Sequence, residues 1–485
     1  MSAKSHVPRE AHSQPDDIYP VHLLDSMKSG FVLVAWVMRF NDVLDVEKLY
    51  SSLSTLLEQG DWRKLGGRLK AAGNGKLELH VPRPFTADRP AVAFTKDDFS
   101  TISIHEHELA SQFPEPQESP YAKVIYDQAD FRCFAAPDGF PSTVKEMMAR
   151  DVPQIGLRTT SFNDATLVSL VWPHTLMDGM GQTALLQSWS LMLAGKQDQI
   201  PQVIGAREDV LNQLGTMPPP DEPLEIDSHY PSRLGLISFI FKTLWRRFFY
   251  SPKQTRIIFL PRRAVDELKR TAKEEADGTF LSEGDVLTAW ICKAIASAEP
   301  EPHPLTVLNL MNARGRLPWL TTKGVYLQNM VGVAGTYLSA QQSRASIGDI
   351  ATEHRRQIAK QATAEQVTLF FQDAWKRLLA KQNPRMAFIG ETDSRVMFTN
   401  NLTKASYIQV TDFSPAVIRQ GQDEKTRINP SGTMVNYMHL VMKGPIKLAD
   451  NFYIVGKDHA GNYWLMGTVS DQAWARFDEA LEALQ

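Results

Sequence analysis

The chain has 485 residues and a formal net charge of -3, and 43% of its residues are hydrophobic. This length allows two or three domains with sizeable cores, whereas the near-neutral charge gives no electrostatic case for nucleic acid or an anionic membrane as the main partner. Only two cysteines occur, Cys133 and Cys292, which fits a reducing compartment and excludes a disulfide framework or a multi-cysteine metal site.

Strands and helices alternate in the first part of the chain. The pattern predicts a buried strand over 31–40 (FVLVAWVMRF), followed by a helix over 45–59 with leucines at helical spacing. A second buried strand is predicted over 165–172 (ATLVSLVW), and a helix over 182–195 (QTALLQSWSLMLAG) with Gly195 as its stop. The polar first residues lack the apolar region of a signal peptide, and no window is apolar over the length needed to cross a bilayer.

A proline-rich acidic stretch over 213–232 indicates a linker between two halves. Residues 234–250 (LGLISFIFKTLWRRFFY) mix aromatic and basic side chains, and we expect a helix packed on the body, with a membrane-surface helix as the alternative. Strands and helices resume beyond this stretch. Strands are predicted over 254–260 and 462–469, with more between 439 and 458, and residues 305–318 go from strand to turn. Helices are predicted over 263–276, 282–298 and 472–484. This alternation predicts an α/β protein, which we divide into residues 1–195, a crossover over 196–250, and residues 251–485.

The strongest chemical signal follows the predicted strand over 165–172. Pro173 cannot donate a ladder hydrogen bond, so pairing should end there, and His174 comes next on an anchored backbone. An imidazole that titrates near about 6.5 can accept a proton from an alcohol or an amine at neutral pH. Asp178 either orients the ring or holds the loop through a salt bridge, and we favour the salt bridge.

Two glycines follow this aspartate. Gly179 and Gly181 permit backbone angles that side chains would block, so we expect them to shape a turn. His-x-x-x-Asp is a weak pattern alone, and the alternative is a core histidine bonded to a carbonyl, with Asp178 as a helix N-cap. The run from Gly179 also fits G-x-G-x-x-A, but in a dinucleotide site the first glycine directly follows the strand.

HTLMDG, residues 174–179, resembles the HxxxD(G) active-site motif of the BAHD acyltransferases, a branch of the chloramphenicol-acetyltransferase-like superfamily. Other segments resemble this family in order and spacing, most strongly its fungal secondary-metabolism members: DSMKSGFVLVAWVMRF with WRKLGGRL, LSEGDVLTAWICKAI, NARGRLP with GVYLQN, and FTNNLTKASYIQVTDFSPA. The resemblance implies an α/β fold of two pseudo-symmetric chloramphenicol-acetyltransferase-like domains. Each would be a mixed sheet flanked by helices, with a channel between them.

The resemblance also implies a reaction. An acyl group would move from a CoA thioester to a hydroxyl or amine of a small-molecule secondary metabolite, with His174 as general base. Acyl-CoA would be a co-substrate, and neither a bound cofactor nor a metal is expected. Asp178 would point away from the channel and pair with Arg314 or Arg316, while Gly179 would support the turn. A cytoplasmic monomer without nucleic-acid partner or transmembrane segment is expected.

This chain departs from the family at two places. Asn401 stands where the family has a tryptophan that donates to the developing oxyanion, and an amide can donate as an indole N–H does. The alternative is that Asn401 is a turn residue and that Thr399, which we also expect to contact substrate, or a backbone N–H takes this role. Of the family's Asp-Phe-Gly-Trp-Gly element only Asp412 and Phe413 remain, which puts packing in doubt more than catalysis.

Other functions stay open on the sequence alone. Peptide-synthetase condensation domains share the implied fold, but here Pro173 replaces the first histidine of their HHxxxDG motif. A superfamily member recruited for cyclisation or isomerisation, and a non-catalytic binding protein of the same fold, are two further alternatives. His105 and His107 could be read as a metal site, but no third ligand of suitable type is nearby, and a solvated strand face is the simpler interpretation.

Overall fold

The computed structural model describes residues 14–485 except 28–29, 74, 125–129, 233, 236, 239–240, 242–252, 318–319, 321–322, 383–389, 391–392, 422–426 and 444–448. Most of the segment 234–250, for which we expected a helix, lies outside the described residues. Within the described part, no helix combines the length and apolar character needed to span a membrane.

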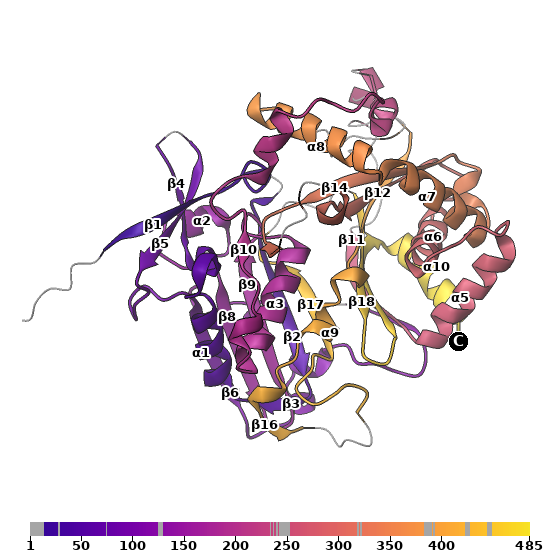
Figure 1. Ribbon diagram of the computed structural model, residues 1–485. Helices are drawn as coiled ribbons and strands as arrows, with labels where there is room; N and C mark the ends of the chain where they lie inside the picture. Colours follow the sequence, from indigo (N-terminus) through magenta and orange to yellow (C-terminus); the bar gives the residue numbers. More distant parts are fainter. Residues whose placement is uncertain are drawn as a thin grey trace, which may run out of the picture.

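Two large sheets form the body of the molecule (Figure 1). Their strands, with those of three small sheets, are β1 (Gln14–Pro20), β2 (Leu33–Phe40), β3 (Asp42–Leu44), β4 (Arg68–Ala71), β5 (Leu77–Arg83), β6 (Ala93–Phe99), β7 (Tyr121–Val124), β8 (Gly156–Phe162), β9 (Thr166–Pro173), β10 (Val203–Ile204), β11 (Lys253–Leu260), β12 (Leu305–Asn312), β13 (Val325–Tyr326), β14 (Val331–Leu338), β15 (Arg395–Asn401), β16 (Val417–Gln420), β17 (Asn436–Val441), β18 (Asp450–Lys457) and β19 (Tyr463–Ser470). The α-helices are α1 (Val46–Leu56), α2 (Val144–Met148), α3 (Gly179–Leu193), α5 (Arg262–Glu275), α6 (Glu283–Ala296), α7 (Ile347–Gln361), α8 (Ala364–Leu379), α9 (Tyr407–Val410) and α10 (Asp471–Glu482).

The five-stranded sheet has the order β17-β2-β9-β8-β6 and carries the His174 segment. Every residue of β2 and β9 is buried, as expected for strands that read as continuous apolar runs. The antiparallel register of these two strands ends with Leu33 opposite Pro173, and His174 follows as the first residue beyond the ladder. Helices α1 and α3 pack together beside this sheet, where the indole nitrogen of Trp189 donates to the Leu49 carbonyl oxygen at 3.2 Å.

The seven-stranded sheet has the order β14-β12-β15-β18-β19-β11-β7. One of its faces packs against α5, α6, α7 and α10, which gather on the right of Figure 1, in a core that includes Leu268, Trp290 and Trp474. Side chains from the other face, including Phe259 and Trp464, belong to the core cluster of the five-stranded sheet. The two sheets therefore share a continuous apolar contact, and residues between them are enclosed from both sides.

The sheets exchange strands. β17, from the C-terminal part of the chain, is the edge strand beside β2 (Figure 1), and β7, from the N-terminal part, pairs with β11. A division by sequence at residues 195 and 250 therefore assigns these two strands to the half whose sheet they do not join. The proposed boundaries describe the order of the chain, while the sheets interlock across them.

Most of the predicted elements are found within a few residues of their expected ends. Gly195 has a φ of +70° directly after α3, which is the left-handed conformation that commonly ends a helix. Ser282 caps α6 in a reciprocal capping box with Asp285. Both signals lie in the residues at the helix end itself, which is why they could be read from the sequence.

Candidate active site

His174 lies in the turn between β9 and α3, with its side chain partly buried. Its backbone N–H donates to the Val32 carbonyl oxygen at 2.9 Å, and Leu176 N closes the turn onto the Pro173 carbonyl oxygen at 2.9 Å. Its imidazole has no hydrogen-bonding partner among the described residues. The ring is therefore free to accept a proton from a bound molecule, since no neighbour occupies its nitrogen atoms.

Asp178 makes its hydrogen bonds with residues other than His174. It caps α3, where its Oδ1 accepts hydrogen bonds from Met180 N at 3.0 Å and Gly181 N at 3.2 Å. Its side chain is 3% exposed and pairs with Arg314, at 2.9 Å from each terminal guanidinium nitrogen to a carboxylate oxygen. Met330 N donates a further hydrogen bond, at 2.9 Å, to Oδ2. Both carboxylate oxygens therefore have hydrogen-bonding partners other than His174. The salt bridge with Arg314 holds the shape of the turn, which is the role that we favoured for Asp178.

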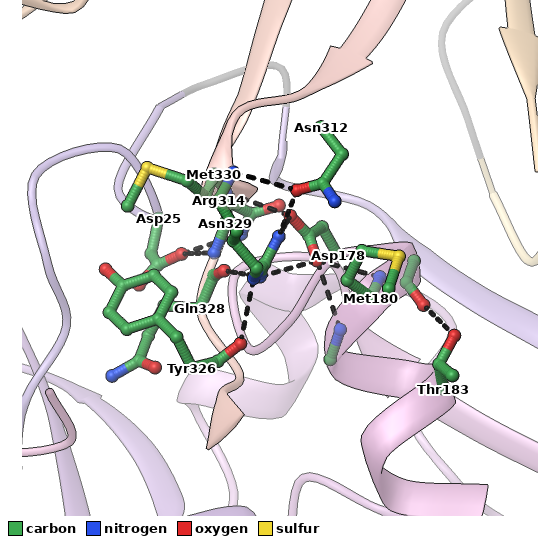
Figure 2. A network of polar contacts seen from close by, with 12 residues as sticks. Asp25, Asp178, Met180, Thr183, Asn312, Arg314, Tyr326, Gln328, Asn329 and Met330 are labelled. Carbon is green, nitrogen blue, oxygen red and sulfur yellow. Dashed lines mark hydrogen bonds and ion pairs between the residues drawn. The ribbon is translucent and has the colours of Figure 1, made fainter. Parts of the chain in front are cut away.

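Arg314, rather than Arg316, is the partner of Asp178. The Arg314 guanidinium also donates to the carbonyl oxygens of Tyr326 at 3.1 Å and Gln328 at 2.6 Å, as Figure 2 shows. Arg316 instead donates to the Asn312 carbonyl oxygen at 2.7 Å. An arginine that satisfies a carboxylate and two carbonyls at once joins three segments in a fixed geometry, because its donors form a rigid planar fork.

Residues 326–330, which we call the docking segment, connect the C-terminal half to the His174 turn. Asn329 donates from Nδ2 to the His174 carbonyl oxygen at 2.9 Å, and Gln328 donates from Nε2 to the Gly205 carbonyl oxygen at 2.6 Å. Asn329 in turn contacts Asp25, and Figure 2 shows Asp25, Asn329 and Arg314 in one polar network. The sequence analysis did not single out Asn329 or Asp25. Their only signal was that both lie in segments that resemble the family.

Gly179 and Gly181 do not act as predicted. Both lie inside α3, and neither has a positive φ, so the expectation that they provide unusual backbone angles is wrong. They are needed for close approach: a Cβ on Gly179 would lie 2.4 Å from the Tyr407 hydroxyl, and one on Gly181 would lie 2.2 Å from the Leu327 carbonyl oxygen. The missing side chains let α9 and the docking segment contact the first turn of the helix.

A buried aromatic cluster lies behind this helix start. Trp36 packs edge-on against Trp172 and Tyr407, with ring centroids 5.4 Å and 4.4 Å apart. The polar atoms of all three side chains have no hydrogen-bonding partner among the described residues. Burial raises the pKa of Tyr407 well above its usual range, so this hydroxyl stays protonated and serves as a packing group against Gly179.

Thr399 and Asn401 lie on β15 in the seven-stranded sheet. They share a strand face with Met397, which belongs to the core beneath α6, and a Cβ on Gly284 would lie 2.5 Å from Asn401 Nδ2. Asn401 Oδ1 accepts a hydrogen bond from Thr403 N at 3.0 Å, and the Thr399 hydroxyl is buried without a partner in the described part of the chain. No hydrogen bond or ion pair between described residues joins either one to the His174 turn, so the structure brings together His174, Asp178 and Arg314 but not these two.

The remnant of the second family motif has a structural place. Phe413 is fully buried and packs against Phe40 and Trp189, with ring centroids 5.1 Å and 4.5 Å away. Asp412 is exposed, and its Oδ1 accepts a hydrogen bond from Ser414 N at 2.9 Å. Phe413 therefore joins α3 to β2 through apolar contact, whereas Asp412 shapes the loop that follows it.

The two histidines considered as metal ligands are separate in role. His105 lies in a short 3-10 helix rather than on the expected strand face, while His107 Nδ1 accepts backbone hydrogen bonds from Leu109 at 3.2 Å and Ala110 at 3.1 Å. Within the described ranges, no group of three or more histidine, cysteine or acidic side chains is arranged to hold a metal ion.

Comparisons with known proteins agree with this geometry. A family model described as Transferase family matches residues 139–396. Acetyltransferase pyiB of Pyricularia grisea is 33% identical over 97% of this chain and 95% of its own length, and O-acetyltransferase PaAT-2 of Phomopsis amygdali is 32% identical over 97% and 98%. The structure of F. graminearum TRI101 complexed with coenzyme A and T-2 mycotoxin matches with a TM-score of 0.67 at 14% identity, over 97% of each chain, which confirms the two-domain fold. The chain belongs to the Transferase family, among the fungal BAHD-type acyltransferases.

Proposed function

We propose that this acyltransferase moves an acyl group from a CoA thioester to a hydroxyl of a small-molecule secondary metabolite, with His174 as the general base. The observation that carries the proposal is the His174 turn. Its backbone is bonded from both halves of the chain, Asp178 is fully engaged with Arg314, and the imidazole has no partner among the described residues. An imidazole on an anchored backbone, with its ring nitrogens available, is what abstraction of a proton from a bound hydroxyl requires.

The chemistry proceeds in two steps. The imidazole takes the hydroxyl proton as the acceptor oxygen attacks the thioester carbonyl carbon, which leaves an oxyanion on a tetrahedral intermediate. When the intermediate collapses, the C–S bond breaks, and the leaving CoA sulfur takes the proton from the imidazolium. Acyl-CoA is consumed as a co-substrate, and none of these steps calls for a bound cofactor.

Relatives support the nature of the two substrates. The names acetyltransferase and O-acetyltransferase of the two fungal relatives favour acetyl-CoA as donor and an alcohol as acceptor. The TRI101 complex contains coenzyme A and a mycotoxin, which favours a small-molecule secondary metabolite as acceptor class. We propose that the enzyme acts as a cytoplasmic monomer on these two small molecules.

Stabilisation of the oxyanion is a separate part of the proposal. Asn401 Nδ2 donates no hydrogen bond to a described residue, while its Oδ1 is held by Thr403 N, so the amide is fixed with its donor available. This supports Asn401 as the donor to the developing oxyanion. Thr399 is proposed as a contact of the bound substrate. Asn400, on the opposite face of β15 and in register with Tyr453, is the rival donor.

The test is to incubate the protein with acetyl-CoA and a panel of alcohols and amines, and to follow both free thiol and the masses of the acceptors. Acyl transfer predicts stoichiometric thiol release and an acetyl mass increase on an alcohol. A mass increase on amines alone would move the reaction to N-acylation. Conversion of an acceptor without thiol release would favour a cyclase or isomerase, and binding with neither product would favour a non-catalytic protein.

A further inference from the structure

The main chain of His174 is held at both of its polar atoms by different parts of the chain. Its N–H donates to the Val32 carbonyl oxygen at 2.9 Å, next to β2, and its carbonyl oxygen accepts from Asn329 Nδ2 at 2.9 Å, in the docking segment. The first bond comes from the sheet that carries His174, and the second comes from the C-terminal half. The Asn329 bond therefore sets where the turn lies relative to the other half.

Asn329 is itself locked in place by Asp25. Its side-chain nitrogen lies 2.7 Å from Asp25 Oδ1, and its backbone nitrogen lies 2.8 Å from the same oxygen. An asparagine amide has two N–H groups. One is used on Asp25 and the other on the His174 carbonyl oxygen, so the amide cannot turn without breaking both bonds.

Asp25 lies in a closed polar environment. Its exposed fraction is 2%, and that of Lys64 is also 2%. The Lys64 ammonium group has no hydrogen-bonding partner among the described residues, but its charge acts on Asp25, as does the carboxylate of Asp209. Burial raises the pKa of Asp25 to about 7, while Lys64 and the hydrogen bonds from Asn329 oppose this rise. A buried carboxyl group that accepts two N–H groups is a stiff anchor, because releasing them would leave all three groups unpaired.

The free imidazole makes this anchor important for the chemistry. No described residue bonds to the ring, and Asp178 is committed to Arg314 and to the start of α3. The direction of the ring then depends on where the backbone of residue 174 is held. On the basis of the proposed function, we propose that Asn329 and Asp25 are positioning residues that fix the general base by holding the His174 carbonyl oxygen.

Asn329→Ala tests the proposal, with Asn436→Ala as its matched control. Asn436 is also buried and also donates from Nδ2 to a backbone carbonyl oxygen, that of Pro114 at 2.6 Å, but it pairs with Arg39 at the far end of β2. Both variants lose one buried amide, so both should have a lower Tm. We expect kcat for acetyl transfer to fall roughly a hundredfold in Asn329→Ala alone, because small displacements of a reacting group have effects of this size, with KM for acetyl-CoA unchanged.

Variants of Asp25 test the same proposal, because Asp25 holds Asn329, which in turn holds the His174 carbonyl oxygen. Asp25→Asn keeps the Oδ1 acceptor, and we expect its kcat to stay within a few-fold of wild type. Asp25→Ala removes the acceptor, and its kcat should fall nearly as far as that of Asn329→Ala. The proposal is overturned if folded Asn329→Ala and Asp25→Ala keep wild-type kcat. It is also overturned if kcat falls as far in Asp25→Asn as in Asp25→Ala. The outcome is separate from that of the proposed function, which is tested on the wild-type enzyme and fails if that enzyme transfers no acyl group to a hydroxyl.

Discussion

Two buried aspartate–arginine pairs join the N-terminal half of the chain to its C-terminal half. Asp178 accepts two hydrogen bonds from Arg314 and one from Met330 N beside the proposed base. At the other end of the five-stranded sheet, Asp42 accepts two from Arg427, at 3.0 Å and 2.8 Å, and one from Gly432 N. Asp42 has no exposed surface. The bonding pattern is nearly the same, but only one pair lies near His174.

The difference is one of place rather than of chemistry. β2 begins opposite Pro173 and ends just before Asp42, so the two pairs are separated by the length of an eight-residue strand, about 26 Å at the usual rise per residue. Figure 1 shows β3, which begins with Asp42, near the lower end of the molecule. Loss of either pair should destabilise the protein, but only loss of the Asp178 pair should displace the base.

The largest expected effect is that of Asp178→Asn compared with Asp42→Asn. An amide NH2 in place of Oδ2 cannot accept from Arg314 or from Met330 N, so the partly buried guanidinium loses its counter-charge and one of its two hydrogen bonds to residue 178. Breaking a buried pair typically costs about 3–5 kcal/mol of stability. We expect Tm to fall by similar amounts in both variants, as measured by thermal unfolding. Activity per folded molecule should fall only in Asp178→Asn.

Two results would break the comparison. Unchanged stability with lost activity in Asp178→Asn would mean that Asp178 orients the imidazole directly. Lost activity per folded molecule in Asp42→Asn would mean that catalysis follows overall stability rather than the position of the turn.

Asn401→Ala, with Asn400→Ala as its control, tests the proposed donor to the oxyanion. Removing one oxyanion donor typically costs about a hundred- to a thousandfold in rate, and we expect kcat of Asn401→Ala to fall in this range with KM for acetyl-CoA nearly unchanged. Asn400 is its chain neighbour on the opposite strand face, and its variant should keep wild-type kcat. The reverse pattern would assign the donor to Asn400.

Alanine variants of the two glycines of α3 test whether each glycine is needed for contact with a backbone atom or with a side chain. A Cβ on Gly181 would meet the Leu327 backbone oxygen, whereas one on Gly179 would meet the Tyr407 hydroxyl. Overpacking usually costs about 1–3 kcal/mol, so both alanine variants should have a lower Tm. Adding Tyr407→Phe should restore much of the loss in Gly179→Ala and none in Gly181→Ala. Equal rescue of both would show that the clash at residue 181 is relieved elsewhere.

A smaller effect is expected from the buried carboxyl group of Asp25, whose contribution to stability should depend on pH. Burial raises the pKa of Asp25 to about 7, so the folded state holds this proton more tightly than the unfolded chain does. The contribution of Asp25 to the free energy of unfolding is therefore greatest at low pH, and it declines as pH rises towards about 7. Urea denaturation from pH 5 to 8 should show the stability of wild type relative to Asp25→Asn decreasing with pH. A constant difference would contradict the raised pKa.

The fold and the place of His174 in the turn after a buried strand could be predicted because their signals are local. The apolar runs of β2 and β9, the capping box at Ser282 and the break at Pro173 act through neighbouring residues. The choice of Arg314 over Arg316 could not be made, since it depends on how the 3-10 turn of residues 314–316 directs two similar side chains. The glycines were misread for a different reason: the need for a missing Cβ comes from Tyr407 and Leu327, which are distant in sequence.

Asp25 and Asn329 show the limit most clearly. They are separated by 304 residues and meet where the docking segment contacts the His174 turn. A buried carboxyl group in an apolar stretch gives no sign in the sequence of which amide it will hold. The exchange of β7 and β17 between the sheets is hidden in the same way, because strand pairing over such separations is decided by the assembled core.

The central claim is that His174 supplies the proton transfer while Asp178 supplies only the geometry. The measurement that tests it most directly is kcat for acetyl transfer together with Tm for His174→Ala. The account predicts that kcat falls by about two to four orders of magnitude, the usual contribution of a positioned general base, while Tm stays close to wild type because the imidazole bonds to no described residue. A variant that keeps near-wild-type kcat would contradict it.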